Sequence, residues 1–380
     1  MMLPNLATIA RIDAYLAHHV PASPCLIVDL ETVRQRYRAL RDALPQTRVY
    51  YAVKANPAAP VIAALAAEGA NFDLASAGEI ARCLDLGIAP DRFCFGNTIK
   101  PETTIAAAHA QGIGLYAFDC EAELDKIASA APGQRVFCRI AVHGGKADWP
   151  LSRKFGCAPA IASDLLLQAR AKGLRPIGVS FHVGSQQTDP EAWTHAIAHA
   201  ATVFRTCAGQ GLALELLNLG GGLPAQYRTP IPTLDQYIQT IEKALRTQFG
   251  TTQPELMIEP GRHLTGDAGL LRSTVLLISQ HDSRRWVYLD AGRYNGLAET
   301  QNEAIHYPIR TPGRAGPAEP VVLAGPTCDS TDIIYDRTPT PLPLDLQIGD
   351  TVDFLTAGAY TASYASVEFN GFPPLQTHCI

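Results

Sequence analysis

The chain has 380 residues, of which 47% are hydrophobic and 18% are charged. This length and balance are typical of a compact enzyme with one large and one smaller domain, and they exclude a mainly disordered chain. The formal net charge of −5 and the lack of a Lys/Arg cluster argue against nucleic acid as a partner.

The sequence also gives no indication of export or membrane insertion. No uninterrupted apolar segment near the N-terminus resembles a signal peptide, and no stretch approaches the length of a membrane span. The nine cysteines form no CxxC pair, and an odd number without an export signal fits reduced thiols. We therefore expect a cytoplasmic protein that does not bind membranes.

Apolar strands and amphipathic helices alternate through the first two thirds of the chain. A strand is predicted at 24–29 and a helix at 31–43. Eight strands follow, near 48–53, 70–74, 92–95, 113–118, 135–141, 176–182, 214–219 and 255–258. Most are separated by helical stretches, at 59–68, 77–86, 102–111, 121–130, 160–172, 190–209 and 233–248. This α/β pattern predicts a (β/α)8 TIM barrel over residues 36–265.

Past residue 265 the helical patterns thin out. Strands are predicted at 274–280, 285–290, 320–324 and 350–356, and Thr338–Pro343 is interpreted as a stiff loop between strands. We expect residues 266–380 to form a C-terminal domain resembling a β-sandwich or β-barrel, joined by the N-terminal strand at 24–29.

Lys54 follows the apolar run Tyr50–Val53 and precedes the turn signal Asn56-Pro57. A lysine at the mouth of a buried strand is costly to desolvate, and its commonest use is a Schiff base. A lysine whose ammonium group extends into water explains the same segment. The segment alone leaves both interpretations open.

Other strand ends carry groups that suit a flat cofactor bearing a phosphate. His182 can stack on a ring and Ser185 can reach a phosphate, although a lone histidine is more often part of a core. Gly220–Gly222 lets backbone N–H groups approach an anion, without the GxGxxG spacing of a dinucleotide fold. Glu259 can hold a heterocyclic nitrogen protonated and Arg262 suits a phosphate, unless the two form only a surface turn with a local ion pair.

Two segments of the β-domain add further polar groups. They are Gly325–Ser330, which contains Cys328, and Gly358–Thr361. Both can reach the barrel site only if the β-domain of the same or a neighbouring subunit covers it. An inert buried thiol is the alternative for Cys328.

Taken together and in this order, seven motifs resemble the ornithine/lysine decarboxylase family. These are the group IV decarboxylases, which depend on pyridoxal 5'-phosphate (PLP) and share an alanine-racemase-like barrel. The motifs are Tyr51–Asn56, Phe72–Ser76, Ser180–Ser185, Gly220–Gly222, Glu259–Arg262, Gly325–Asp329 and Gly358–Thr361. The similarity spans nearly the whole chain, including Ser152–Gly156 and Phe369–Phe372.

The resemblance implies PLP as the cofactor. It implies that Lys54 forms the Schiff base with PLP, that Glu259 pairs with the pyridine nitrogen of the cofactor, and that His182 stacks on the cofactor ring. The residues implied to hold the phosphate are Ser185, Gly222, Gly261, Arg262 and Tyr360, and those implied to surround the lysine and the cofactor are Asp73, Glu79 and Arg139. Because a carboxylate keeps the ring nitrogen protonated, Glu259 favours decarboxylation over racemisation.

The resemblance also implies a homodimer with active sites shared across the interface. Cys328 acts as the general acid and Asp329 pairs with the distal ammonium of the substrate, both reaching the site of the neighbouring subunit. Lys154 and Asp332 are implied to form an ion pair between subunits. An isolated subunit is therefore expected to be inactive.

Asp329 indicates the class of substrate. Because no positively charged residue accompanies it, this aspartate suits a substrate with a simple ω-ammonium group. We expect L-ornithine, giving putrescine for polyamine biosynthesis, with L-lysine or both as the alternative, because one methylene is worth only about 1–3 kcal/mol. Animal-type relatives carry a second aspartate that this chain lacks. Glu299 or Glu303 takes its place, or Asp329 acts without it; Tyr360 is a further candidate for substrate contact.

Other interpretations are disfavoured. A catalytically dead regulatory homologue that binds a protein partner would lack a residue of the cofactor or acid set. Every member of that set is present: Lys54, His182, Glu259, Arg262 and Cys328. No metal is expected, since His195 and His199 have i,i+4 spacing but no acidic third ligand is apparent. The segment His143–Asp148 is expected to be a mobile loop over the site.

Overall fold

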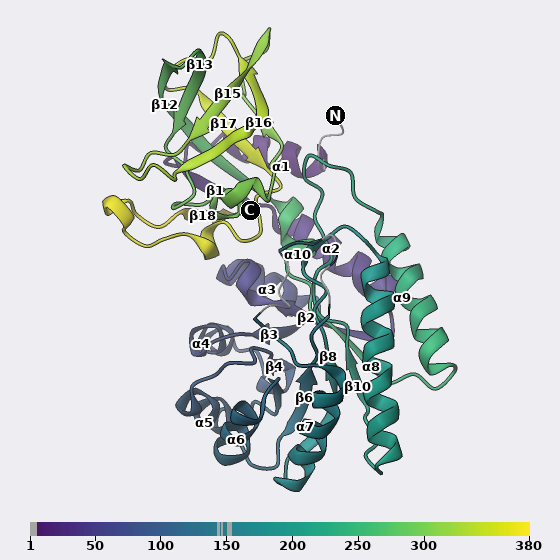
Figure 1. Cartoon of the computed structure of the whole chain (residues 1–380). Helices are drawn as coiled ribbons and strands as arrows, with labels where there is room; N and C mark the ends of the chain where they lie inside the picture. Colours follow the sequence, from purple (N-terminus) through teal and green to yellow (C-terminus); the bar gives the residue numbers. More distant parts are fainter. Residues whose placement is uncertain (1–5, 143–144, 146, 150–153) are drawn as a thin grey trace. The chain divides into compact units, whose positions relative to one another are not determined.

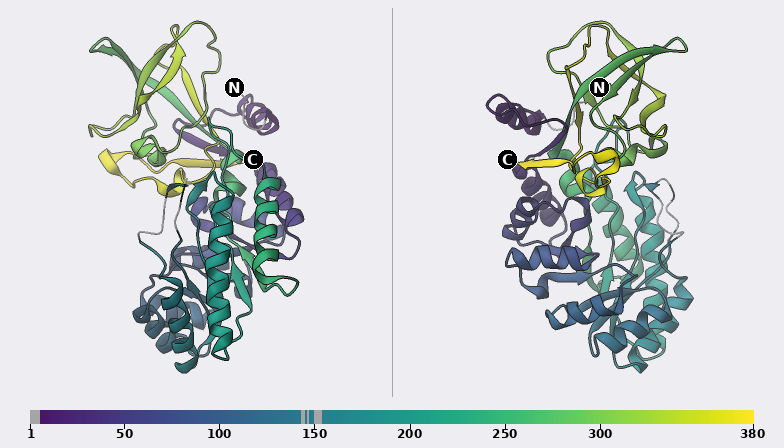
Figure 2. Two further views of the ribbon diagram at one scale, coloured as in Figure 1. Left: turned by 45° about the vertical axis from the view of Figure 1, so that its right-hand side comes forward. Right: turned by 90° about the vertical axis from the view of Figure 1, so that its left-hand side faces the viewer.

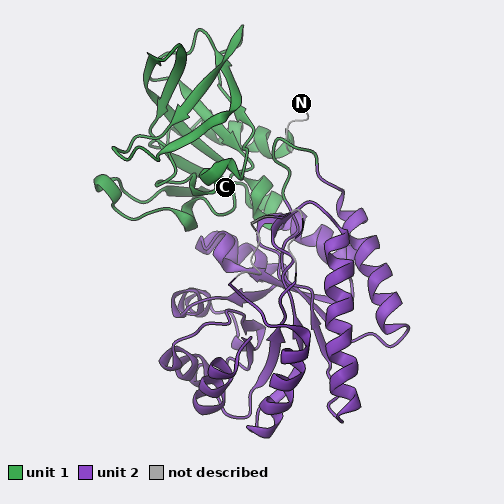
Figure 3. Cartoon of the chain, in the orientation of Figure 1, with its two compact units in different colours: residues 1–33, 225–230, 264–380 green, residues 34–224, 231–263 purple. Residues whose placement is uncertain are grey.

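A computed structural model describes residues 6–142, 145, 147–149 and 154–380. The chain forms two compact units (Figure 3): unit 1 comprises residues 1–33, 225–230 and 264–380, and unit 2 comprises residues 34–224 and 231–263. Part of the loop expected at His143–Asp148 lies outside the described residues. Its end belongs to strand β7 (Ala147–Trp149), which pairs antiparallel with β9 (Ser185–Gln187).

Unit 2 contains a closed barrel of eight parallel strands, which confirms the predicted TIM barrel. The strands are β2 (Thr47–Ala52), β3 (Asn71–Leu74), β4 (Phe93–Phe95), β5 (Leu115–Phe118), β6 (Arg135–Arg139), β8 (Arg175–Ser180), β10 (Leu216–Asn218) and β11 (Glu255–Ile258). Pairing of β11 with β2 closes the ring. Apolar side chains from these strands form a buried cluster, which includes Tyr50, Leu115, Phe137 and Met257.

Helices surround the barrel strands in unit 2 (Figures 1 and 2). They are α3 (Ala59–Ala67), α4 (Ala77–Asp85), α5 (Glu102–Ala110), α6 (Glu121–Ala130), α7 (Pro159–Ala171), α8 (Glu191–Gly209) and α9 (Leu234–Phe249). Helix α2 (Leu30–Ala43) begins in unit 1 and continues into unit 2. Capping residues mark where two of these helices begin. Thr233 and Gln236 form a capping box at the start of α9, and Ser76 caps the start of α4.

Unit 1 is built on an eight-stranded curled sheet (Figure 1). Its strands are β1 (Cys25–Val28), β12 (Gly269–His281), β13 (Arg284–Leu289), β14 (Ile309–Arg310), β15 (Ala318–Ala324), β16 (Ile333–Pro343), β17 (Thr351–Leu355) and β18 (Gln376–Cys379). The strand order is β14-β17-β12-β13-β15-β16, and β1 pairs with both β12 and β18. The early strand thus lies in the same sheet as the late strands of the chain.

Several elements differ from the sequence-based expectation, among them one misinterpreted segment and one helix. Thr338–Pro343 is not a loop but part of β16. That strand ends the strand order, so its prolines remove few ladder hydrogen bonds. Helix α1 (Leu6–Leu16) was not predicted; its Ile12 packs in a cluster with Ile27 and Leu270. None of the described helices is long and apolar enough to cross a membrane.

A buried ion pair joins the segment after β4 to helix α6. Lys100 has a side chain that is 0% exposed, and its Nζ lies 2.9 Å from Glu123 Oε1. The same ammonium donates to the carbonyls of Asn97 and Ala117. Burial lowers the pKa of Lys100, while Glu123 opposes this shift. Lys126 Nζ lies 2.5 Å from the other oxygen of Glu123, Oε2. The buried charges are therefore stabilised by one another, by the two carbonyls and by Lys126, which together replace water.

We predict that Lys100→Met destabilises the protein by up to about 3–5 kcal/mol, because it removes the fully buried partner of Glu123 and leaves that carboxylate paired with the more exposed Lys126. Urea unfolding measures this loss, and Lys100→Met combined with Glu123→Leu should recover much of it. The control is Lys172→Met, which removes an exposed pair with Asp125 and should have little effect. A Lys100→Met variant as stable as this control would contradict the prediction.

Candidate active site

The predicted residues of unit 2 gather at one end of the barrel, because parallel strands end on the same face. Each lies at or just beyond the end of a barrel strand: Lys54 after β2, Asp73 in β3, Arg139 in β6, His182 after β8, Gly220–Gly222 after β10 and Glu259 after β11. Lys54 itself lies in a short 3-10 turn, Val53–Ala55, rather than on the strand.

Lys54 and Asp73 form an ion pair, with 2.9 Å between Nζ and Oδ2. The lysine side chain is 45% exposed, whereas that of Asp73 is 4% exposed. A Cβ on Gly96 would lie 2.0 Å from Asp73 Oδ1, so only glycine fits at that position. The pair thus gives Lys54 a fixed partner while leaving its amine accessible to solvent.

Glu259 is a second carboxyl group close to the first. Burial, reinforced by the charge of Asp73, raises the pKa of Glu259 to about 7, although Lys54, Asn218 and Arg139 act in the opposite direction. The side-chain ligand atoms of Asp73, Cys94 and Glu259 lie within 4.8 Å of one another. Burial raises the pKa of the Cys94 thiol well above its usual value.

His182 is held as a neutral imidazole. Its Nδ1 accepts a hydrogen bond from the Gly184 amide at 3.0 Å, so the ring proton lies on Nε2. Burial, with the charges of Arg139 and Lys54, lowers the pKa of His182 well below its usual value. An uncharged, flat ring suits stacking rather than proton transfer.

Arg139 and Glu79 flank these groups. The guanidinium of Arg139 lies 4.9 Å from the Phe155 ring centroid, and burial lowers its pKa. Glu79 accepts a hydrogen bond from the Ala75 amide, and burial raises its pKa. The charge of Lys54 acts in the opposite direction and favours the ionised form of Glu79.

Backbone and guanidinium groups at this end of the barrel suit an anion. A Cβ on Gly220 would lie 1.9 Å from the Phe181 oxygen, and one on Gly222 would lie 2.6 Å from the Gly184 oxygen. Both glycines have positive φ, at 65° and 119°. Arg262, a buried residue next to Gly261, donates from Nη2 to Ser185 Oγ at 3.2 Å.

Sequence analysis missed Asn218, the last residue of β10. Its side chain donates from Nδ2 to Glu259 Oε1 at 2.6 Å, and its Oδ1 accepts from the Gly220 amide at 2.9 Å. The one signal in the sequence is an amide residue at a strand end, two positions before a glycine run.

The remaining predicted residues belong to unit 1, where Cys328 and Asp329 lie on an exposed loop. The Cys328 amide donates to Asn370 Oδ1 at 3.1 Å. Asp329 Oδ1 accepts from the hydroxyl and the amide of Thr331, which lower the pKa of Asp329. The predicted general acid and the predicted carboxylate are therefore held side by side by local hydrogen bonds.

Asp332 has a role within its own chain. It is 3% exposed, and its carboxylate accepts from the Arg293 amide and from the amide and hydroxyl of Thr327. The predicted ion pair with Lys154 of another subunit stays a prediction. Within the chain, the Lys154 ammonium lies 4.9 Å from the Phe155 ring centroid.

The structure does not favour Glu303 as a substrate contact. Its carboxylate accepts from three amides of β16, those of Asp336, Arg337 and Thr338. Burial alone would raise the pKa of Glu303, but these three hydrogen-bond donors lower it to about 2.

The other two predicted substrate contacts also belong to unit 1. Glu299 is buried, and Tyr360 has a backbone φ of 56°.

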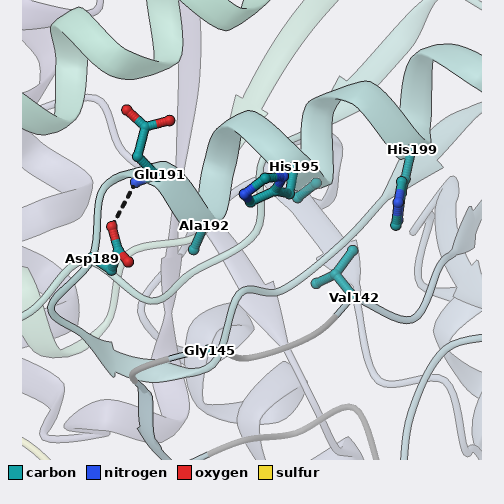
Figure 4. A pocket seen from close by; sticks show the side chains of 8 residues that line it. Val142, Gly145, Asp189, Glu191, Ala192, His195 and His199 are labelled. Atoms are coloured by element: carbon teal, nitrogen blue, oxygen red, sulfur yellow. Dashed lines mark hydrogen bonds between the residues drawn. The ribbon is translucent and has the colours of Figure 1, made fainter.

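His195 and His199 are exposed on α8 and line a surface pocket of about 370 Å³ (Figure 4). Asp189 and Glu191 line the same pocket, so acidic groups do lie nearby, contrary to the sequence-based expectation. Asp189 Oδ1 already accepts the Glu191 amide at the start of α8. Among the described residues, these side chains do not converge on one point as metal ligands do.

Comparisons with known proteins agree with this geometry. Residues 30–266 match the family model described as pyridoxal-dependent decarboxylase, pyridoxal binding domain. The chain is 34% identical over 359 residues to lysine/ornithine decarboxylase of Selenomonas ruminantium, covering 94% of this chain and 89% of that one. It is 33% identical over 368 residues to antizyme inhibitor 2 of Xenopus laevis, covering 93% and 80%. The structure of lysine/ornithine decarboxylase from Vibrio vulnificus complexed with cadaverine has a TM-score of 0.89 at 33% identity, covering 100% of both chains.

The chain belongs to the pyridoxal-dependent decarboxylase family. It is therefore an enzyme whose cofactor is PLP, as its resemblance to this family predicted. The residues of this decarboxylase fit the cofactor: a half-exposed lysine side chain at Lys54, a carboxyl at Glu259, and a glycine segment at Gly220–Gly222 whose close backbone packing leaves no space for a Cβ.

We predict that Glu259→Gln stabilises the decarboxylase without its cofactor at pH 8 but not at pH 5. The pKa of Glu259 is raised from 4.5 to about 7 in the folded chain, so its ionisation costs stability as pH rises from about 4.5 to about 7. Glutamine stays neutral and avoids this cost, which is of the order of a few kcal/mol.

Thermal unfolding of the cofactor-free proteins between pH 5 and pH 8 measures the difference. Glu255→Gln, an exposed position on the same strand, is the control and should show no such pH-dependent gain. Parallel melting-temperature curves for Glu259→Gln and the unchanged chain would contradict the prediction.

Proposed function

We propose that this decarboxylase acts on L-ornithine, releasing CO2 and putrescine for polyamine biosynthesis, with L-lysine or both amino acids as the alternative. The observation that carries this proposal is Asp329, a partly exposed carboxylate beside the exposed Cys328, and its hydrogen bonds to Thr331 lower its pKa. Such a group suits a distal ammonium. The relatives described as lysine/ornithine decarboxylases support the same class of substrate.

We propose that residues 36–265 bind PLP and that residues 266–380, with the strand at 24–29, form the accompanying β-domain. When bound, PLP supplies an aldehyde for the substrate amine and a ring that withdraws the electron pair left by CO2. Lys54 holds the cofactor covalently, Glu259 keeps its ring nitrogen protonated and His182 stacks on the ring. The phosphate contacts are Ser185, Gly222, Gly261, Arg262 and Tyr360; Asp73, Glu79 and Arg139 surround the lysine.

Cys328 is proposed to deliver the final proton to the substrate Cα from its Sγ. In this proposal the active enzyme is a cytoplasmic homodimer, and Cys328 and Asp329 serve the site of the partner subunit. Asp329 binds the distal ammonium, with Glu299 and Tyr360 as further substrate contacts. These roles are supported by the resemblance of the sequence motifs to the decarboxylase family. They are also supported by the hydrogen bonds that hold Cys328 and Asp329 in one loop.

A regulatory protein without activity is the alternative of another class, since one relative is described as antizyme inhibitor 2. The geometry disfavours it. Lys54 is paired with Asp73, Arg262 with Ser185, and Glu259 with Asn218, so the cofactor-binding groups are not only present but ordered.

We predict that kcat/KM is higher for ornithine than for lysine, with a ratio of at most about 100-fold because the two differ by one methylene. Diamine release from ornithine, lysine, arginine and diaminopimelate by the holoenzyme measures this. Asp329→Asn should reduce turnover of both ornithine and lysine, with cofactor absorbance unchanged as the control. A higher value for lysine would establish the alternative, and no diamine from either would contradict the proposed function.

We predict that a Lys54→Ala subunit and a Cys328→Ala subunit complement each other. Each homodimer should be nearly inactive, since one lacks the covalent attachment and the other the acid. Random mixing by co-expression should restore about one quarter of the activity, because half the dimers contain one intact site.

The control replaces Cys328→Ala by Cys120→Ala, an exposed thiol outside the proposed site, which should be active without mixing. Borohydride should fix the cofactor to the Cys328→Ala protein but not to Lys54→Ala. Complementation that fails while Cys328→Ala alone is inactive would show that sites are not shared. Unchanged turnover in Cys328→Ala would remove the proton-donor role.

A further inference from the structure

Asn218 lies between the two strands that carry the ring-binding groups. It pairs in register with Ser180 of β8 and with Met257 of β11, so His182 follows one neighbour and Glu259 follows the other. The residue is 0% exposed. A carboxamide without access to water must satisfy its polar atoms within the protein.

The surrounding backbone decides how the amide is oriented. The Gly220 amide is always a donor, so the atom that faces it at 2.9 Å must be the carboxamide oxygen. The NH2 group then faces Glu259 Oε1 at 2.6 Å. Asn218 can therefore only donate to Glu259, and a donor to a carboxyl group favours its ionised form.

Gly220 is tied to the same pair from a second direction. The Glu259 amide donates to the Gly220 carbonyl at 2.8 Å. At the next residue, a Cβ on Gly221 would lie 2.6 Å from the Glu259 carbonyl oxygen. The glycine segment and Glu259 are thus packed backbone to backbone, with the Asn218 side chain as the link between the glycine amide and the carboxylate.

Glu259 needs such a donor. Burial and the nearby Asp73 act against its charge, and the donor from Asn218 acts in favour of it. A carboxyl that became neutral would no longer hold a protonated ring nitrogen.

We propose that Asn218 is a positioning residue of the cofactor site, which keeps Glu259 ionised and aimed while fixing Gly220–Gly222 for the phosphate. It thereby couples the groups at the two ends of the cofactor. This inference rests on the proposed roles of Glu259 and Gly222. It adds a residue to the site that neither contacts the substrate nor transfers a proton.

The test uses Asn218→Leu, which keeps nearly the same side-chain shape and removes both hydrogen bonds, and Asn218→Ala as a second variant. PLP affinity is measured by titration of the cofactor-free proteins, after circular dichroism has shown that the variant is folded. We expect affinity to fall about 10-fold or more in each, by analogy with the loss seen when the hydrogen-bond partner of a metal-binding side chain is removed. Asn71→Leu, an asparagine at the opposite end of a barrel strand, is the matched control and should bind PLP normally.

A double-mutant cycle with Glu259→Gln tests whether Asn218 acts through Glu259. If it does, adding Asn218→Leu to Glu259→Gln should lower PLP affinity by clearly less than the fold-change of Asn218→Leu alone. Fully additive losses, or unchanged affinity in folded Asn218→Leu and Asn218→Ala, would overturn the proposal.

The 15N chemical shift of PLP labelled at the ring nitrogen separates this inference from the proposed function. A protonated nitrogen is expected in the unchanged enzyme, with loss of proton occupancy in Asn218→Leu. An unprotonated nitrogen in the unchanged enzyme would refute the role of Glu259 itself. Full protonation in Asn218→Leu, with normal affinity, would refute only the role of Asn218.

Discussion

Two carboxyl groups, the buried Asp73 and the partly buried Glu259, lie close together at one end of the barrel, and the rest of the site depends on balancing their charges. Two like charges in such a place cannot both ionise without compensation. Lys54 compensates Asp73 through a 2.9 Å ion pair, and Asn218 donates to Glu259. The site therefore holds a reactive amine and an acid of raised pKa through the same set of interactions. Chemistry that removes the lysine charge would disturb this balance, so the amine, the carboxylates and the amide form one electrostatic unit.

Close backbone packing fixes the geometry of that unit. Gly96 leaves room for the Asp73 carboxylate, and Gly220 and Gly222 let the loop after β10 pack on the loop after β8. Any side chain at these positions would push a strand end away by an ångström or more, which is enough to misplace a reacting group. The glycines thus fix the relative positions of the strand ends that carry the site.

The barrel and its active end could be predicted from the sequence, because hydrophobic periodicity marks the strands and polar residues follow them. Lys54 and Glu259 were found in this way. Asn218 and Gly96 could not be found, since their roles depend on register: Asn218 meets Glu259 only because β10 lies beside β11. Thr338–Pro343 was misinterpreted for a similar reason, because prolines exclude a central strand but not an edge strand, and edge position is a property of the sheet. Glu303 likewise looked available in the sequence, yet three amides of β16 occupy it.

Under the proposed role of Asp329, the choice between ornithine and lysine is not encoded in the carboxylate itself. A carboxylate recognises an ammonium group by charge, and charge does not measure the number of methylenes before it. Discrimination of one methylene requires a carboxylate held at a fixed place. Here that constraint comes from residues that bind the loop: Thr331 on Asp329, Asn370 on the Cys328 amide, and the buried Asp332 on Thr327. Under the same proposal, substitutions at these supporting positions leave the charge of Asp329 intact, and they should change the length of the accepted substrate more readily than its class.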